Sequence, residues 1–564
     1  MNSLIRLSRR LRNQAGYTRK TRPLRRGITP PINKSDSLSK AIQKLPLAKE
    51  LVLPLRVYQS LTLEPVVKEG EAVLKGQVIA SLDGFNIHAP SSGTVATIED
   101  RPYANPAGLY APCIVINTDG MDRWHPSISD RASENFNERS PYALIELIAE
   151  AGITGLGGAG FPCHQKLHSA TQHNIDTLII NAMECEPSIA ADEALLQERA
   201  TQVVEGIKIL QYILHAKTCL VAIEDSKDAA IKQLLSAVEG SDIEVVILPT
   251  RYPSGSEQQL IKALCDKELA RGQLPASIGV HCQNVATSYA IFEAICLGRP
   301  LVSRITTITG DALASCNVEV LLGTPVVDAL EFCDENALEK TKSLIFGGPL
   351  MGVELANELC PVNATTNCII ASQSQTLLKP EQDCIRCGFC AQVCPAYLLP
   401  QQLLLASQQG AHEQARAGGL QDCIECGACN YVCPSHIPLV QYYRAEKAEL
   451  RNLDAMASRA QHWQQRFENH QARLDKQKAT ALDRRSRALR MRAKAPQAPI
   501  KTDLHDEQIK APSSATAETS AVLSADQAKS DIQAALARAR AKKAQQQQST
   551  AISDKPHPKS EEKE

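Results

Sequence analysis

The sequence predicts a multidomain protein of β and α/β modules, followed by a helical cysteine-rich module and a polar tail. The chain has 564 residues, more than one hydrophobic core accommodates, so we expect three or four globular domains. The apolar pattern changes from short strands in residues 51–118 to strands alternating with helices in residues 141–299. Further along, one cysteine pattern occurs twice between residues 383 and 439.

The overall charge is close to neutral, with 61 Lys and Arg against 62 Asp and Glu. This balance argues against a nucleic-acid-binding protein. The first 26 residues, however, hold nine basic residues and no acidic one. Such an arm suits a transit peptide, a segment resting on anionic lipid, or a solvated disordered arm. No uncharged stretch is long and apolar enough to predict a membrane span.

Residues 51–118 predict short strands separated by turns, with glycines at regular intervals. Val73 to Ile79 and the segment His88 to Val95, which contains Ala-Pro-Ser-Ser-Gly, resemble the sandwiched-hairpin (barrel-sandwich hybrid) domains that carry biotin or lipoate. In those domains a modified lysine stands at the hairpin tip. Asp83-Gly84 occupies that place here, so we expect the domain to be structural.

Residues 141–299 predict an α/β domain. The runs 177–182, 219–223 and 245–248 are short and rich in β-branched or leucine side chains, as in a buried parallel sheet. Between them, residues 189–215 and 227–238 have helical spacing of apolar residues. Right-handed crossovers should connect the strands. Ile305 to Phe346 is expected to form a small, mostly β module that ends at Gly347-Gly348-Pro349.

The pattern C-x-x-C-x-x-C-x-x-x-C-P occurs at residues 384–395 and again at residues 423–434. This spacing is typical of ferredoxins, in which three close thiolates bind one [4Fe–4S] cluster and the fourth binds the other. Two zinc sites are the alternative, but zinc motifs leave no use for the third close cysteine. Most of the other eleven cysteines are expected to be buried thiols in a reducing compartment.

The duplicated pattern predicts which cysteines share a cluster. We expect the helix that starts near each Cys-Pro step to carry the fourth thiolate across to the other copy. A local arrangement, in which each cluster takes the four cysteines of its own copy, is the alternative. The crossed arrangement gives these two ligand sets: Cys384, Cys387, Cys390 and Cys433 for one cluster, and Cys394, Cys423, Cys426 and Cys429 for the other.

A glycine-rich loop, Gly155 to Pro162, follows a predicted helix rather than a strand, which disfavours an ordinary dinucleotide-binding fold. The loop instead suits close approach of a flat phosphorylated cofactor, with Lys166 as a phosphate partner; a tight interdomain turn is the alternative. Polar residues end the strand at Asn181 to Pro187. With residues 252–258 and 283–287, they should converge at the carboxyl edge of the sheet.

Together these glycine-loop and strand-end segments are similar to the FMN- and NADH-binding subunit of respiratory complex I. With the hairpin domain in front and two ferredoxin motifs behind, the order of modules resembles the C-subunit family of the Rnf (Rsx) ion-translocating electron-transport complex. The resemblance covers about residues 27–447. It implies a peripheral subunit on the cytoplasmic side of a bacterial inner membrane. The expected partners are the other subunits of that complex, NADH or ferredoxin, and the membrane surface.

The resemblance also implies cofactors and their residues. NAD(H) would be the substrate, and FMN would accept a hydride and release single electrons to the two [4Fe–4S] clusters. Phe161 and Glu186 would meet the nicotinamide nucleotide. The complex I subunits carry acidic residues where this sequence has Met183, Ser256 and Ala286. The residues expected to hold FMN are Gly155, Gly157, Gly158, Lys166, Asn181 and Glu184.

Two alternatives remain open on the sequence. One is the soluble diaphorase subunit of a hydrogenase or formate dehydrogenase, which usually lacks the hairpin domain; the other is an iron–sulfur relay subunit without flavin. The expected domains are a basic arm (1–27), a barrel-sandwich hybrid domain (28–135), an FMN/NADH domain (136–300), a small β-grasp-like (SLBB-type) module (301–372), a two-cluster ferredoxin domain (373–440), a charged helical segment (441–494) and a disordered tail (495–564).

Overall fold

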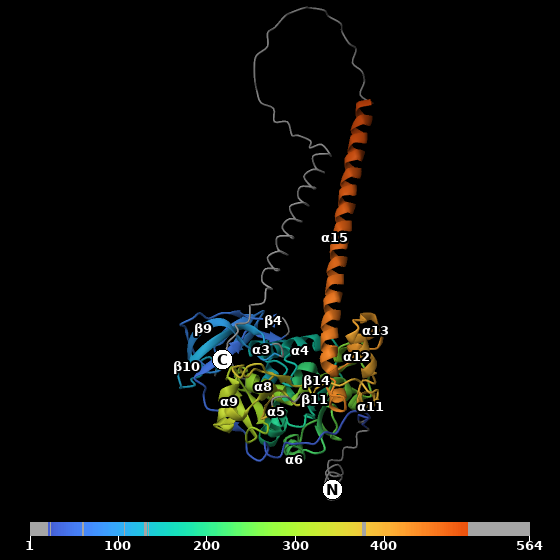
Figure 1. The fold of residues 1–564 in the computed structure, drawn as a ribbon. Helices are drawn as coiled ribbons and strands as arrows, with labels where there is room; N and C mark the ends of the chain where they lie inside the picture. Colours follow the sequence, from blue (N-terminus) through green and yellow to red (C-terminus); the bar gives the residue numbers. More distant parts are fainter. Residues whose placement is uncertain are drawn as a thin grey trace, which may run out of the picture. The chain divides into compact units, whose positions relative to one another are not determined.

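The computed structural model describes residues 21–22, 24–58, 61–105, 108–128, 132, 135–374 and 380–493 (Figure 1). Most of the expected basic arm and the whole expected tail lie outside the described residues. The chain divides into two compact units, Met1–Gln465 and Arg466–Glu564. Within the described residues no helix is both long and apolar enough to cross a membrane.

The first domain is built from short antiparallel strands around an apolar core that includes Leu51, Ile79 and Ile114. Asp83 and Gly84 both have positive φ, +49° and +83°, and turn the chain between two strands, as expected for a hairpin tip. The sheets have the orders β2(Glu50–Pro54)-β10(Tyr110–Thr118)-β9(Gly93–Pro102)-β6(Ala72–Val73), β5(Glu64–Pro65)-β7(Val78–Leu82)-β8(Phe85–His88) and β3(Arg56–Tyr58)-β4(Leu61–Thr62).

The second domain is the expected α/β domain with an all-parallel sheet. Its strand order is β13(Ile243–Leu248)-β12(Thr218–Glu224)-β11(Thr177–Ala182)-β14(Val280–Asn284). Both helices predicted between the strands are present, within two residues of the expected ends. The helices are α3(Pro141–Glu150), α4(Cys163–Thr171), α5(Ala191–Leu214), α6(Asp228–Ala237), α7(Glu257–Cys265) and α8(Val285–Cys296).

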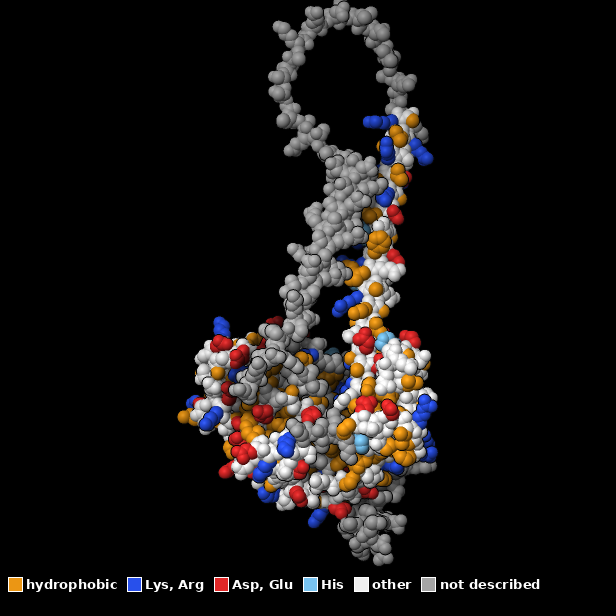
Figure 2. Space-filling model, viewed as in Figure 1, with side chains coloured by type: hydrophobic (Ala, Val, Ile, Leu, Met, Phe, Trp, Pro, Cys, Tyr) orange, Lys and Arg blue, Asp and Glu red, His pale blue; other side chains and the backbone are white. Residues whose placement is uncertain are grey.

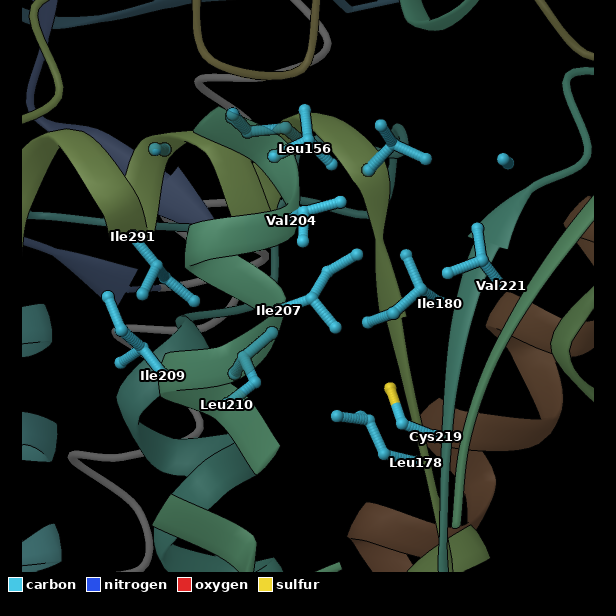
Figure 3. Packing of buried hydrophobic residues seen from close by; sticks show 14 of the residues in the cluster. Leu156, Leu178, Ile180, Val204, Ile207, Ile209, Leu210, Cys219, Val221 and Ile291 are labelled. Atoms are coloured by element: carbon cyan, nitrogen blue, oxygen red, sulfur yellow. The ribbon is translucent and has the colours of Figure 1, made fainter. Parts of the chain in front are cut away.

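Alternate side chains of the strands pack against different helices. Ile180 and Val221 point to the face covered by α5, where Ile207 and Leu210 meet them (Figure 3). Ile179, next to Ile180 along the strand, belongs to the cluster on the opposite face, which contains residues of α7. Each fully buried aliphatic side chain contributes about 1.5–3 kcal/mol to folding. These strands are continuous apolar runs in the sequence because both faces of the sheet are buried.

The third module is mostly β, as the sequence predicted, but it is larger than expected and not purely β. It contains two helices, and its sheet recruits strands from outside Ile305 to Phe346. Val326, Ala329 and Leu330 are buried on one side of the first helix, a helical spacing that the strand prediction overlooked. The sheet order is β1(Gln43–Lys44)-β16(Cys316–Leu321)-β15(Ser303–Thr309)-β19(Cys368–Ser372)-β17(Ser343–Phe346)-β18(Val353–Glu354), with α9(Val326–Cys333) and α10(Ala337–Lys340).

The cysteine module consists of short helices packed against the first turns of α15. The expected position of the helix that bears the fourth cysteine is wrong: the helix comes before the Cys-Pro step and not after it. Cys394 ends α11 in an extended conformation, because a residue before proline avoids helical geometry. The helices are α11(Phe389–Val393), α12(Pro400–Gln408), α13(His412–Ala417), α14(Ala428–Tyr431) and α15(Leu439–Ala493).

Candidate functional site

The eight motif cysteines line two separate cavities. One cavity is lined by Cys384, Cys387, Cys390 and Cys433. The other is lined by Cys394, Cys423, Cys426 and Cys429. Each cavity therefore combines three close cysteines of one copy with the last cysteine of the other copy. Four thiol groups around an apolar cavity form the donor set that a [4Fe–4S] cluster requires.

The walls of the second cavity are apolar and come from helices that the cysteine spacing does not specify. Leu403 of α12 and Val440 and Tyr443 of α15 line it. The Tyr443 hydroxyl donates a hydrogen bond of 2.6 Å to the carbonyl of Pro400, which fixes α15 against α12. Burial raises the pKa of the Cys426 thiol to about 12. A metal-bound thiol is deprotonated in spite of such burial, so metal coordination would offset this effect.

The glycine loop is closed at its base and open at its tip. Thr154 pairs with Pro162, and the Gly155 N–H donates a hydrogen bond of 2.8 Å to the Phe161 carbonyl. Gly158 has a φ of +104°, and a Cβ placed there would meet no atom within 4 Å. On the other side of the loop, a Cβ at Gly157 would lie 3.3 Å from the Asn284 side chain. The tip therefore offers backbone next to free space, as a bound cofactor would need.

Lys166 lies on α4 and has two protein partners. Its Nζ donates to Oε1 of Glu257 and to the carbonyl of Cys282, each at 2.8 Å. Burial by itself would lower the pKa of Lys166, but the Glu257 carboxylate outweighs burial and the pKa is raised. The lysine is therefore a cation at neutral pH. A phosphate at this place would compete with Glu257 for it.

Asn181 and Glu184 hold the turn between β11 and α5. The Asn181 amide donates to the Gly255 carbonyl at 2.8 Å, and its oxygen accepts from the Met183 N–H at 3.0 Å. The Glu184 carboxylate accepts hydrogen bonds from backbone N–H groups in the first turn of α5, including a 2.9 Å bond from Asp192. Both residues therefore fix the loops around the candidate cofactor site.

Phe161 and Glu186 lie against different parts of the molecule. Phe161 makes an edge-to-face contact with Tyr58 of the first domain, with 5.2 Å between ring centroids. Glu186 accepts backbone hydrogen bonds from Leu350 at 3.2 Å and Met351 at 2.9 Å. Its side chain is largely buried, and burial raises its pKa to about 7.

The positions that depart from the complex I pattern also have defined surroundings. Met183 is buried, and its carbonyl lies against Gly255. The hydroxyls of Ser254 and Ser256 are buried without a hydrogen-bond partner. Ala286 donates its N–H to the side chain of Asn284 at 2.9 Å. The two unpartnered hydroxyls lie in the loop whose Gly255 carbonyl accepts a hydrogen bond from Asn181.

A buried charge cluster beside Glu184 was not predicted from the sequence. Lys227 is fully buried and lies 3.2 Å from the Glu224 carboxylate and 3.9 Å from that of Glu184. Asp192 accepts a 2.7 Å hydrogen bond from Asn284, and burial raises its pKa to about 7. In the sequence, the only sign of this cluster is that charged residues interrupt apolar runs. That sign does not indicate which charged residues contact one another.

Three family models match consecutive parts of the chain. Residues 23–121 match the RnfC barrel sandwich hybrid domain. Residues 148–293 match the Nuo51 FMN-binding domain, and residues 381–437 match the 4Fe-4S dicluster domain. A solved NAD⁺-reducing [NiFe]-hydrogenase in its H₂-reduced state matches with a TM-score of 0.40 and 18% identity, over 60% of this chain and 71% of that chain. This likeness is too weak to support a conclusion.

Curated relatives cover most of the chain, and the three that follow are each named as the C subunit of an ion-translocating oxidoreductase complex. The Pseudomonas aeruginosa protein is 49% identical over 79% of this chain and 58% of its own length. The Edwardsiella ictaluri protein is 46% identical over 82% and 58%, and a Yersinia pestis protein is 42% identical over 93% and 85%. The chain thus spans less than two thirds of the first two relatives. It belongs to the C-subunit family of ion-translocating oxidoreductase complexes, with the FMN-binding and 4Fe-4S dicluster domains of that family.

Proposed function

We propose that this chain is a peripheral subunit of an ion-translocating complex and passes electrons between NAD(H), FMN and two [4Fe–4S] clusters. The observation that carries the proposal is the pair of four-cysteine cavities. Cys384, Cys387, Cys390 and Cys433 would bind one cluster, and Cys394, Cys423, Cys426 and Cys429 the other. Neither cavity is lined by the four cysteines of one copy, which supports the crossed arrangement over the local one.

The α/β domain would hold FMN at the glycine loop. The open space at Gly158 and the unpartnered hydroxyls of Ser254 and Ser256 fit a phosphorylated cofactor. Bound FMN would supply the exchange between two-electron hydride chemistry and single electrons. Gly155 and Gly157 would shape the loop, and Lys166 would face the phosphate in exchange for Glu257. Asn181 and Glu184 would fix the surrounding turn.

Phe161 and Glu186 are proposed to contact the nicotinamide nucleotide. Glu186 titrates near neutrality and already accepts two backbone hydrogen bonds, so it can hold a polar ligand group or a proton at its carboxylate. We also propose the domain limits given above, including the β-grasp-like module at 301–372. The partners would be the remaining subunits of the complex, NADH or ferredoxin, on the cytoplasmic face of the inner membrane.

Anaerobic quantitation of flavin and iron in the purified chain, followed by addition of NADH, tests the proposal. We expect one flavin, about eight irons for two four-iron clusters, and bleaching of both chromophores by NADH. Iron without flavin would instead favour the relay subunit. NADH-driven reduction that is unaffected when the hairpin domain is deleted would favour a soluble diaphorase.

A further inference from the structure

The two copies of the cysteine motif share a backbone geometry but have different surroundings. Gly388 and Gly427, at equivalent positions, have φ of +78° and +74°. Cys384 and Cys387 of the first copy are nevertheless exposed, whereas Cys426, the equivalent of Cys387, is buried. The local sequence therefore produces the same backbone geometry in both copies. The residues packed around each copy make them differ in exposure.

The second copy is covered by the α/β domain and the third module. Tyr252, in the loop after β13, is buried, and its hydroxyl donates a hydrogen bond to the carbonyl of Cys426. The backbone of Gly427 lies so close to the carbonyl of Leu350 that no Cβ would fit between them. The Leu350 N–H in turn donates to Glu186, which follows β11. A continuous set of contacts thus joins the candidate nucleotide site to the second cavity.

The first copy carries exposed apolar side chains beside its cysteines. Ile385 is 68% exposed and Phe389 is 48% exposed. At the equivalent positions of the second copy, Ala428 is fully buried and Ile424 packs against the cluster that contains Tyr252. Figure 2 shows hydrophobic side chains reaching the surface of the cysteine module, which Figure 1 marks with α11 and α12. We call Cys384, Ile385, Cys387 and Phe389 the first-motif surface.

We propose that the second-motif cavity is the internal redox station and that the first-motif surface docks a protein partner carrying its own redox centre. This inference rests on the proposed electron-transfer function and adds the order in which electrons pass through the two clusters. Electrons would cross singly between the cavities and then to or from the partner's centre, with one centre oxidised as the next is reduced and no bond made or broken. Because electron transfer slows steeply with distance, the partner must approach the exposed cysteines.

The apolar side chains indicate that the partner is a protein. Exposed aromatic and aliphatic groups beside a functional centre are typical of protein interfaces, in which a few such residues dominate the binding energy. A small hydrophilic electron acceptor would gain nothing from Ile385 or Phe389. In the second copy, by contrast, the equivalent side chains are already covered by this chain itself.

Accessibility of the two centres can be measured by electron paramagnetic resonance on dithionite-reduced holoprotein with a soluble dysprosium chelate. Cys387→Ser and Cys426→Ser identify which signal belongs to which motif. We expect the chelate to shorten the relaxation of the Cys387-dependent signal only. Equal effects on both signals, or a larger effect on the Cys426-dependent one, would overturn the proposal. Dithionite reduces the clusters without NADH. A chain that fails to oxidise NADH would therefore refute the proposed function, while the accessibility of the two clusters could still be measured.

Tyr252→Phe tests the contact between the α/β domain and the second cavity. It removes the hydroxyl that donates to the backbone carbonyl of Cys426 and keeps the buried ring. We expect the midpoint potential of the Cys426-dependent centre to shift to lower values, with no shift of the other centre, since a nearby donor favours the more negative reduced state. No shift, or a shift of the Cys387-dependent centre, would contradict the assignment.

The docking surface is tested with Phe389→Glu, and Leu274→Glu is the matched control, an exposed leucine (58%) on the α/β domain. The probe is washed inside-out membrane vesicles from a strain that lacks only this chain. We expect Phe389→Glu to lower electron transfer between prereduced protein and vesicles about tenfold, as loss of one interface anchor does. Leu274→Glu should match the wild type, and iron content should be unchanged. A wild-type rate for Phe389→Glu, or an equal loss with ferricyanide as acceptor, would refute protein docking at this surface.

Discussion

The cysteine module and the α/β domain hold their candidate sites in different ways. Eight thiols from two short segments line two cavities with mostly apolar walls. In the α/β domain the candidate cofactor residues come from dispersed segments, and their side chains already bind the protein: Lys166 of α4 binds Glu257, and Asn181 of β11 binds Gly255. Spacing along the chain therefore supplies the thiols of the first kind of site. The second kind is assembled by folding, and a ligand must compete there with existing contacts.

Cys394→Ala should have the largest effect, because it removes one of the four proposed ligands that line the cavity of the second motif. We expect loss of about half the iron, since one of two four-iron clusters is affected. Cys384, Cys387 and Cys390 should stay protected from alkylation, which mass spectrometry of the modified peptides measures. Cys219→Ala, at a buried thiol of β12, is the control and should keep all iron. Selective alkylation of Cys384, Cys387 and Cys390 would instead indicate the local arrangement.

Gly157→Val should separate the two kinds of site. The added side chain would press on the Asn284 side chain and so displace the loop, and most of the flavin should be lost while iron is retained. Flavin fluorescence after denaturation and an iron assay measure both quantities. Ala159→Val, in the same exposed loop, should keep its flavin because it already carries a Cβ. Full flavin content in Gly157→Val would place the cofactor elsewhere or favour the relay subunit.

The pH dependence of stability tests Glu186, a candidate site residue of the α/β domain. Its pKa is raised from 4.5 to about 7 by burial. Between these values the folded state keeps a proton that the unfolded state has lost, so stability should fall as pH rises from 4.5 to 7 and then level off. Over this range the free energy of unfolding should fall by about 3 kcal/mol. Glu186→Gln should remove this part of the pH dependence in chemical denaturation. An unchanged pH profile in the variant would show that Glu186 titrates normally.

Deletion of residues 495–564 should have the smallest effect. This segment lacks aromatic residues and cysteines, and its low apolar content predicts that it contributes nothing to a packed site. Flavin content, iron content and NADH oxidation of the truncated chain should equal those of the full chain. A loss of either cofactor would show that one of the two sites needs residues that neither the cysteine spacing nor the α/β pattern identifies.

The strands of the parallel sheet and the cysteine pattern could be predicted from the sequence because both depend on local information. The run at 177–182 is apolar on both faces, which is the requirement of a buried parallel strand, and β11 has those bounds. The helices of the third module were missed, since the buried side of Val326–Cys333 is short. Strand β1 of the same sheet was missed because it lies far from its partner β16 in the sequence. The prediction that a helix starts near the Cys-Pro step was wrong. Helix α11 instead starts after Gly388 and ends just before Cys394 and Pro395.

The sequence by itself determined the two equal cysteine half-sites, since three thiols at fixed spacing and a glycine with positive φ are properties of a short segment. Only the tertiary structure decided that these half-sites are unequal. Tyr252 and Leu350 cover the second copy, whereas Ile385 and Phe389 of the first stay exposed. The same holds for Lys166, whose partner Glu257 lies 91 positions along the chain. Spacing in the sequence specifies which groups a segment presents, but long-range packing specifies what they meet, because burial and pairing depend on the whole fold.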